Sequence, residues 1–187
     1  MARAPDRLDV FWVGADANVT TTTRSPETGR WATPWPIAEA GWASRGAIAA
    51  VTRAADHVQV FWIGSDHNVT TTYWLGTEGA WVEPFPIAPA GWASPGAIAA
   101  VTSSPERLEV FWVGSDRNVT TAIWPDEAGH WVAPFPVAGR ESSQPGAIAA
   151  VARKVGFIAY MIGTANHLDT FWVGPQNNIT TSIWPGL

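Results

Sequence analysis

Short apolar runs recur along the whole chain and are separated by turns rich in Gly, Pro, Asn and Asp. In the run 58–63, Val58, Val60 and Trp62 fall on one face of an extended strand. The residues between them are also mostly apolar, which predicts a strand packed on both faces. No segment has the 3.6-residue period of a helix, so the pattern predicts an all-β fold.

The runs belong to a long repeat. The dipeptide Phe-Trp occurs at 11–12, 61–62, 111–112 and 171–172, always within a variant of Val-Phe-Trp-Val-Gly-x-Asp-x-Asn-Val-Thr-Thr. A fixed period of this length is typical of propellers and other repeat folds. We therefore expect one repeat domain over residues 1–187, with units at approximately 1–45, 46–95, 96–145 and 146–187.

The residue pattern predicts four strands in each complete unit. In the second unit they are 46–51, with small side chains, then 58–63, 68–74 and 81–87. The turn 64–68 contains Asp and Asn, which favour a hairpin, and the prolines of 81–87 favour an outermost strand. Four strands in about fifty residues fit a β-propeller blade.

The two ends of the chain depart from this pattern. The first unit is expected to open on its second strand and the last to end on its third, which gives 14 strands. The apolar segment 154–163 is expected to form a further strand or a subunit contact. Because unpaired edges and bare apolar faces favour aggregation, we expect a homodimer or higher homo-oligomer in which a second chain completes a closed ring.

Composition excludes several classes of function. The net charge of −5 argues against a nucleic-acid partner, and the lack of cysteine removes disulfides and thiolate metal sites. The start has no apolar stretch of the signal-peptide kind, and no run approaches the roughly 20 apolar residues of a membrane-spanning helix. The 13 Trp residues are far more than usual and need a separate explanation.

Three strings carry a resemblance to a known family: Gly-Ala-Ile-Ala-Ala-Val, Leu-Glu-Val-Phe-Trp-Val-Gly-Ser-Asp and Thr-Thr-x-x-Trp. They resemble the repeats of bacterial β-propeller lectins, and of the Photorhabdus-type lectins in particular. The resemblance implies sugar binding, to fucose or related sugars, in shallow sites between adjacent blades. That family is seven-bladed, whereas this chain has strands for about 3.5–4 blades.

A lectin site needs an exposed aromatic ring that stacks on the C–H face of a sugar, with polar groups beside it. Trp42 and Trp92 lie in Gly-rich links between units and are the first candidates for this ring. The alternative is that they only cap the contact between blades. Ser142 replaces them in the third link, where binding is expected to be weak or absent.

Polar candidates lie in the same links and in the hairpin turns expected on the same rim. The residues are Ser44, Ser94, Asp66, Asp116, Asn68 and Asn118. Their alternative role is to form the turns themselves. A second set of rings, Trp74, Trp124 and Trp184, ends the third strand of three units, and Arg24 stands there in the first unit.

The sequence therefore predicts a multivalent lectin without a metal or other cofactor. The alternative is a propeller scaffold that binds proteins and no sugar. An enzyme is disfavoured because the four histidines do not recur at ligand spacing and no phosphate loop or nucleophile elbow is present.

Overall fold

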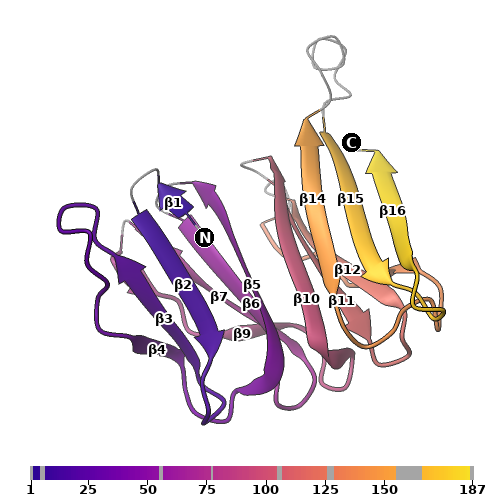
Figure 1. Ribbon diagram of the computed structural model, residues 1–187, viewed down its shortest axis with the longest axis horizontal. Helices are drawn as coiled ribbons and strands as arrows, with labels where there is room; N and C mark the ends of the chain where they lie inside the picture. The colour runs from indigo at the N-terminus through magenta and orange to yellow at the C-terminus, as the bar shows by residue number, and fades with distance from the viewer. Residues whose placement is uncertain are drawn as a thin grey trace. The chain divides into compact units, whose positions relative to one another are not determined.

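The computed structural model is built entirely from antiparallel sheets where the chain is described (Figure 1). The described residues form no helix, so they include no helix that is long and apolar enough to cross a membrane. The chain divides into two compact units, residues 1–96 and 97–187. The structure describes residues 2–4, 7–54, 57–76, 78–104, 107–125, 129–154 and 166–185.

The first unit contains two sheets. The strands of the first sheet are β1 (Ala2–Ala4), β2 (Arg7–Val13), β3 (Val19–Arg24) and β4 (Trp35–Ala38), in that order. The second sheet has β5 (Ala43–Ala54), β6 (His57–Gly64), β7 (Val69–Leu75) and β8 (Ala80–Trp81) in order, and β9 (Phe85–Ala88) also pairs with β7.

The third and fourth sheets make up the second unit, apart from Ala93–Gly96 at the start of β10. The third sheet has β10 (Ala93–Ser104), β11 (Arg107–Gly114), β12 (Val119–Pro125) and β13 (Phe135–Ala138). The fourth has β14 (Ile148–Lys154), β15 (Asn166–Val173) and β16 (Ile179–Pro185).

The all-β, four-stranded unit is confirmed, and three expectations about the strands are wrong in detail. The first unit does have an inner strand, β1, which three residues are too few to reveal by pattern. The inner strands β5 and β10 begin at Ala43 and Ala93, earlier than expected. The fourth strand of the second sheet is split into β8 and β9. The predicted segment 154–163 lies outside the described residues from 155 onward.

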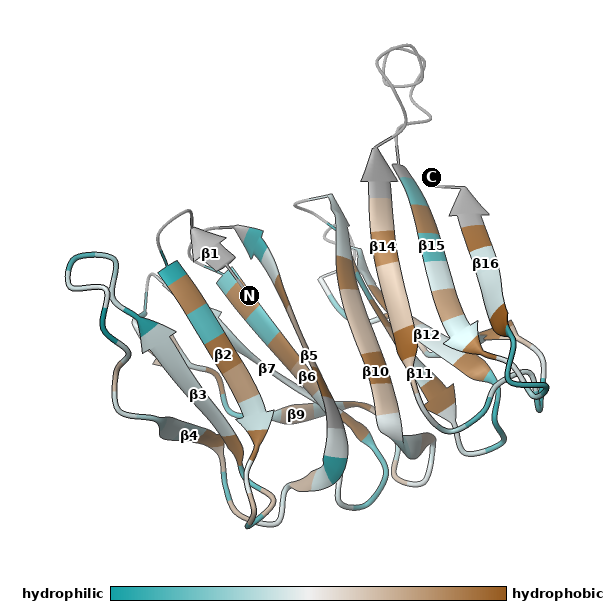
Figure 2. Ribbon diagram, viewed as in Figure 1, coloured by the Kyte–Doolittle hydropathy of each residue, from teal (hydrophilic) through white to brown (hydrophobic). Residues whose placement is uncertain are grey.

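Within the first unit, the two sheets pack face to face. Val19, Ile37 and Ala38 of the first sheet form one core with Val58 and Trp62 of the second, all buried. We call the side of a sheet that carries Val19 its forward face, and the side that carries Val58 its back face. β6 is buried from Val58 to Gly64, which confirms a strand packed on both faces. Figure 2 shows the apolar residues on the strands and polar residues in many of the turns.

Candidate functional site

The link between two sheets is bonded to the hairpin turn of the sheet before it. In the first unit, the amide of Gly41 donates to the carbonyl oxygen of Asp16, and that of Ala43 to Ala17, both at 2.9 Å. The same two bonds recur at Gly91–Asp66, Ala93–His67, Glu141–Asp116 and Ser143–Arg117. Links and turns therefore share one rim, as the repeat predicted.

The Asp and Asn residues of the turns are engaged within the turns. Oδ1 of Asp66 accepts from the amide of Asn68 at 3.1 Å, and Oδ1 of Asn68 accepts from the Thr70 hydroxyl at 2.7 Å. A Cβ on Gly64 would lie 2.1 Å from Oδ1 of Asn68, so a glycine is required there. The residue of this turn with a positive φ is His67 (63°).

The corresponding residues of the third sheet have the same role with extra polar contacts. Oδ1 of Asp116 accepts from the amide of Asn118 at 3.2 Å, and Oδ2 accepts from the Asn118 side chain at 3.2 Å. Arg140 lies 3.4 Å from Oδ2 of Asp116. Of the two candidate serines, Ser44 donates to the carbonyl oxygen of Gly64 at 2.7 Å, and Ser94 is half-buried.

Trp42 lies at the corner where the first sheet passes into the second. Its amide donates to the carbonyl oxygen of Glu39 at 3.4 Å, and its own carbonyl oxygen accepts from the amide of Ser65 at 3.3 Å. The backbone is thus held at both sides while the side chain stays 39% exposed. Trp92, at the equivalent position after the second sheet, is 47% exposed.

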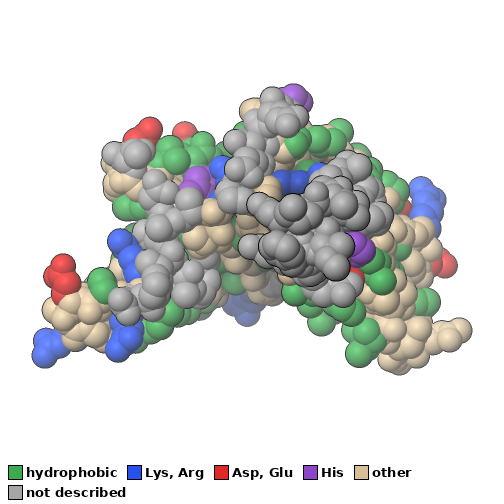
Figure 3. Space-filling view, turned by 90° about the horizontal axis from the view of Figure 1, so that it is seen from above, with side chains coloured by type: hydrophobic (Ala, Val, Ile, Leu, Met, Phe, Trp, Pro, Cys, Tyr) green, Lys and Arg blue, Asp and Glu red, His purple; other side chains and the backbone are tan. Residues whose placement is uncertain are grey.

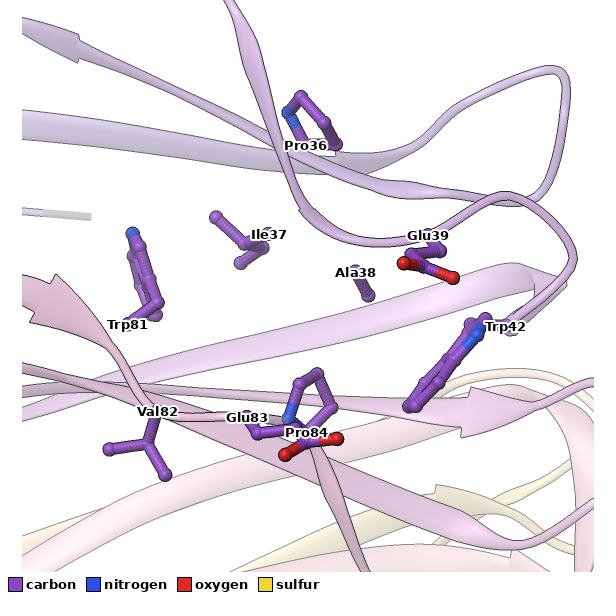
Figure 4. Close-up of a pocket in the computed structure, with 9 residues that line it drawn as sticks. All are labelled: Pro36, Ile37, Ala38, Glu39, Trp42, Trp81, Val82, Glu83 and Pro84. Carbon is purple, nitrogen blue, oxygen red and sulfur yellow. The ribbon is translucent and has the colours of Figure 1, made fainter.

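An open groove of about 310 Å³ lies beside Trp42, within the first unit (Figure 4). One wall comes from β4 and the residues after it, and the other from the segment between β8 and β9. Pro84 has no amide hydrogen to contribute to the sheet, which is consistent with the strand being interrupted there. The lining residues are Pro36, Ile37, Ala38, Glu39, Trp42, Trp81, Val82, Glu83 and Pro84.

Aromatic rings and carboxylates occupy distinct places in this groove. Figure 4 shows Trp42 and Trp81 at opposite ends, with the carboxylates of Glu39 and Glu83 near the Trp42 end, one from each wall. Ile37 and Ala38 are buried, whereas both glutamates are exposed. The lining thus combines an accessible indole, an apolar base and two hydrogen-bond acceptors, the usual ingredients of a small-ligand site.

Sequence reasoning missed the two glutamates because they do not recur. Aligning the repeats could have identified both glutamates, because the surrounding motif is constant whereas the residues aligned with Glu39 and Glu83 differ from repeat to repeat. Glu39 aligns with Pro89 and Gly139, and Glu83 with Thr33 and Ala133.

The second set of rings packs against neighbouring indoles. Trp74 and Trp81 meet edge to face with ring centroids 5.9 Å apart, and Trp124 and Trp131 do so at 5.8 Å. Trp74 and Trp124 are half-buried, and the Trp184 side chain lies outside the described residues. The in-strand residues Trp62 and Trp112 are fully buried, as expected for core.

One buried carboxyl group lies away from the groove. Burial raises the pKa of Glu109, against the opposing effects of a hydrogen bond and charge from Arg107 and a weaker hydrogen bond from Ser103. Asp9 and Asp169 are buried at the aligned positions, and Gln59 stands there in the second sheet.

Charged groups are otherwise dispersed. Over the described part of the chain, no group of three or more His, Asp or Glu side chains is placed to hold a metal ion. On the face shown in Figure 3, Lys and Arg side chains lie in separate groups and form no continuous patch among the residues described.

Comparison with solved structures identifies the fold. The lectin BP39L from Burkholderia pseudomallei matches 97% of this chain at 25% identity with a TM-score of 0.83, and the match covers 49% of that lectin. SapL1, solved with alpha methyl fucoside, matches 96% of this chain at 19% identity and TM-score 0.67, over 56% of its own length.

The Aleuria aurantia lectin, a six-bladed β-propeller described with a novel fucose recognition mode, matches 95% of this chain at 16% identity and TM-score 0.65, over 53% of its length. No protein-family model matches the chain, and a search of curated proteins gave no match. The chain thus has the blade architecture of β-propeller lectins and spans about half the length of those it matches.

Proposed function

We propose that the chain is a carbohydrate-binding lectin and that the groove beside Trp42 is one of its sugar sites. The observation that carries the proposal is an exposed indole, held by backbone bonds on both sides, that lines an open groove with two carboxylates beside it. The similarity to SapL1, solved with alpha methyl fucoside, and to the Aleuria aurantia lectin, described with a novel fucose recognition mode, supports the same class of ligand.

The sugar stacks its C–H face on Trp42, and its hydroxyls donate to the carboxylates of Glu39 and Glu83. Fucose or a related deoxy or methylated sugar fits because its methyl group adds apolar contact with the ring. The groove is open and shallow, so a single site is expected to bind in the millimolar to tens-of-micromolar range, about −4 to −6 kcal/mol.

Titration calorimetry with methyl α-fucoside tests this site directly. Replacing Trp42 with Ala removes the stacking ring, and we expect heat from this site to disappear. The Trp42→Phe variant keeps a smaller ring at the same place and is expected to retain part of the affinity. Unchanged binding in Trp42→Ala would contradict the assignment of this ring.

Trp92 is the proposed second ring, since it occupies the equivalent place and is also exposed. The Trp42→Ala and Trp92→Ala variants together should then remove more sugar binding than either alone. On a glycan-coated surface, two linked sites raise the apparent affinity by roughly 10²–10⁴. A glycan array without any signal would instead favour the scaffold alternative.

The proposed assembly is a homo-oligomer in which the forward face of the fourth sheet packs on the back face of the first. Within the first unit, the same two kinds of face form the core around Val19 and Val58. In the fourth sheet the forward-face residues Ile179 and Ile183 are 81% and 57% exposed, and on the back face of the first sheet Val10 is 43% exposed. A second copy covers both faces with the contact that the chain already uses internally.

A further inference from the structure

Two acidic side chains give this groove a negative charge, although the repeat motif contains no acidic residue at either position. Glu39 follows β4 at the end of one repeat and Glu83 lies between β8 and β9 of the next, yet both line the same groove. The aligned residues of the other repeats are uncharged: Pro89 and Gly139 for Glu39, Thr33 and Ala133 for Glu83. The fold therefore brings together two substitutions that are far apart in the sequence.

Among the described residues that line the groove, none carries a positive charge to balance the two glutamates. The neighbouring Arg45 is directed elsewhere, since its guanidinium donates to the carbonyl oxygen of Ala15 at 3.4 Å. Two like charges on facing walls make the potential between them negative and favour a positively charged ligand group. The indole of Trp42 adds to this preference, because the face of a Trp ring attracts cations.

We propose that the groove prefers a sugar with a protonated amino group, that is, a 2-amino-2-deoxyhexose with a free ammonium. The inference rests on the proposed sugar binding at Trp42 and specifies its ligand. The pyranose ring stacks on the indole while the ammonium at its edge donates charge-assisted hydrogen bonds to the two carboxylates. A neutral sugar makes the same stacking contact without the charge.

The size of the preference follows from the exposure of the two glutamates. Exposed ion pairs contribute little individually, so two of them should raise affinity about 3- to 10-fold over a neutral sugar of the same shape. The preference should weaken as salt is added, because exposed charges are screened.

Calorimetry or NMR titration of the full chain at low salt measures this with four sugars: glucosamine, N-acetylglucosamine, glucose and methyl α-fucoside. We expect glucosamine to bind about 3- to 10-fold more tightly than N-acetylglucosamine and glucose. The double variant Glu39→Gln/Glu83→Gln should bind the sugars without this preference. The matched variant Glu27→Gln/Glu78→Gln removes two exposed carboxylates that do not line the groove and should keep it.

The outcomes separate this inference from the proposed function. Equal binding of glucosamine and glucose, or a preference that survives the Glu39→Gln/Glu83→Gln change, overturns the inference and leaves the lectin intact. Loss of the preference on adding EDTA also overturns it, since a bridging metal ion would then be the binding group. If none of the four sugars binds, both proposals are wrong.

Discussion

The indole nitrogen of Trp172 donates a hydrogen bond of 2.8 Å to the carbonyl oxygen of Ser142. In the first unit the carbonyl oxygen at the aligned position, Trp42, accepts from the backbone amide of Ser65 instead. Pro175 aligns with Ser65 and has no amide hydrogen, so the carbonyl oxygen of Ser142 is available to the indole. The Trp172 indole thus has a hydrogen-bond partner, whereas the indole nitrogen of the aligned Trp62 has none among the described residues.

Because of this bond, we expect two similar substitutions in the second unit to lower the free energy of unfolding by different amounts. Trp112 is fully buried and its indole nitrogen has no hydrogen-bond partner in the described part of the chain, whereas that of Trp172 donates to Ser142. Replacing Trp172 with Phe loses a hydrogen bond, while replacing Trp112 with Phe removes an unpaired donor. We expect Trp172→Phe to lower the free energy of unfolding by about 1–2 kcal/mol more than Trp112→Phe.

Denaturant unfolding followed by far-UV circular dichroism measures both variants against the parent chain. The two substitutions remove the same atoms from buried positions, so each serves as the control for the other. A larger loss for Trp112→Phe would contradict the hydrogen-bond assignment.

The buried carboxyl group of Glu109 predicts a pH dependence of stability. Its pKa is raised in the folded chain, so the folded state holds the proton more tightly than the unfolded state. The stabilisation from the protonated form is complete below the unfolded pKa, for which 4.5 is the reference value, and is lost as the pH rises through the raised folded pKa.

The substitution Glu109→Gln should remove this loss. Gln59 stands at the aligned position, where it donates to the Thr71 hydroxyl at 3.1 Å, and Thr121 aligns with Thr71. The stability of the variant relative to the parent should therefore increase from pH 4 to pH 8, as thermal unfolding measures. The exposed Glu141→Gln is the control, and a relative stability of Glu109→Gln that stays flat or decreases with pH would contradict the prediction.

The sequence predicts most of the strands and turns because the residues in each of them strongly favour that local structure. Phe-Trp strands, Asp-x-Asn turns and Pro-containing outer strands recur, and repetition reinforces each assignment. The inner strand β1 could not be found this way, since Ala2–Ala4 contains no pattern. Nor could the pairing of Glu39 with Glu83, because it depends on which segments of two successive repeats face each other. The recurring residues therefore predict the fold, whereas the acidic groove depends on residues that differ between the repeats.

The forward face of the fourth sheet and the back face of the first sheet both expose apolar side chains. On β16, Ile179, Thr181 and Ile183 are exposed and alternate with less exposed residues, and on the first sheet Val10 is exposed where its aligned residue Val60 is fully buried. Burial of each isoleucine on the back face of another copy is worth about 1.5–3 kcal/mol. We expect light scattering to give an assembly of at least two chains of 20.1 kDa each.

Two sets of substitutions test which faces meet. Ile179→Thr/Ile183→Thr keeps β-branched residues in the strand but removes apolar surface, and Val10→Thr does the same on the opposite partner face. Because the proposed contact joins these two different faces, each set should raise the dissociation constant about tenfold or more. Val132→Thr alters an exposed valine outside both faces and should have no effect. A monomeric parent chain at tens of micromolar, or an assembly that tolerates both sets, would show that the faces do not bind each other.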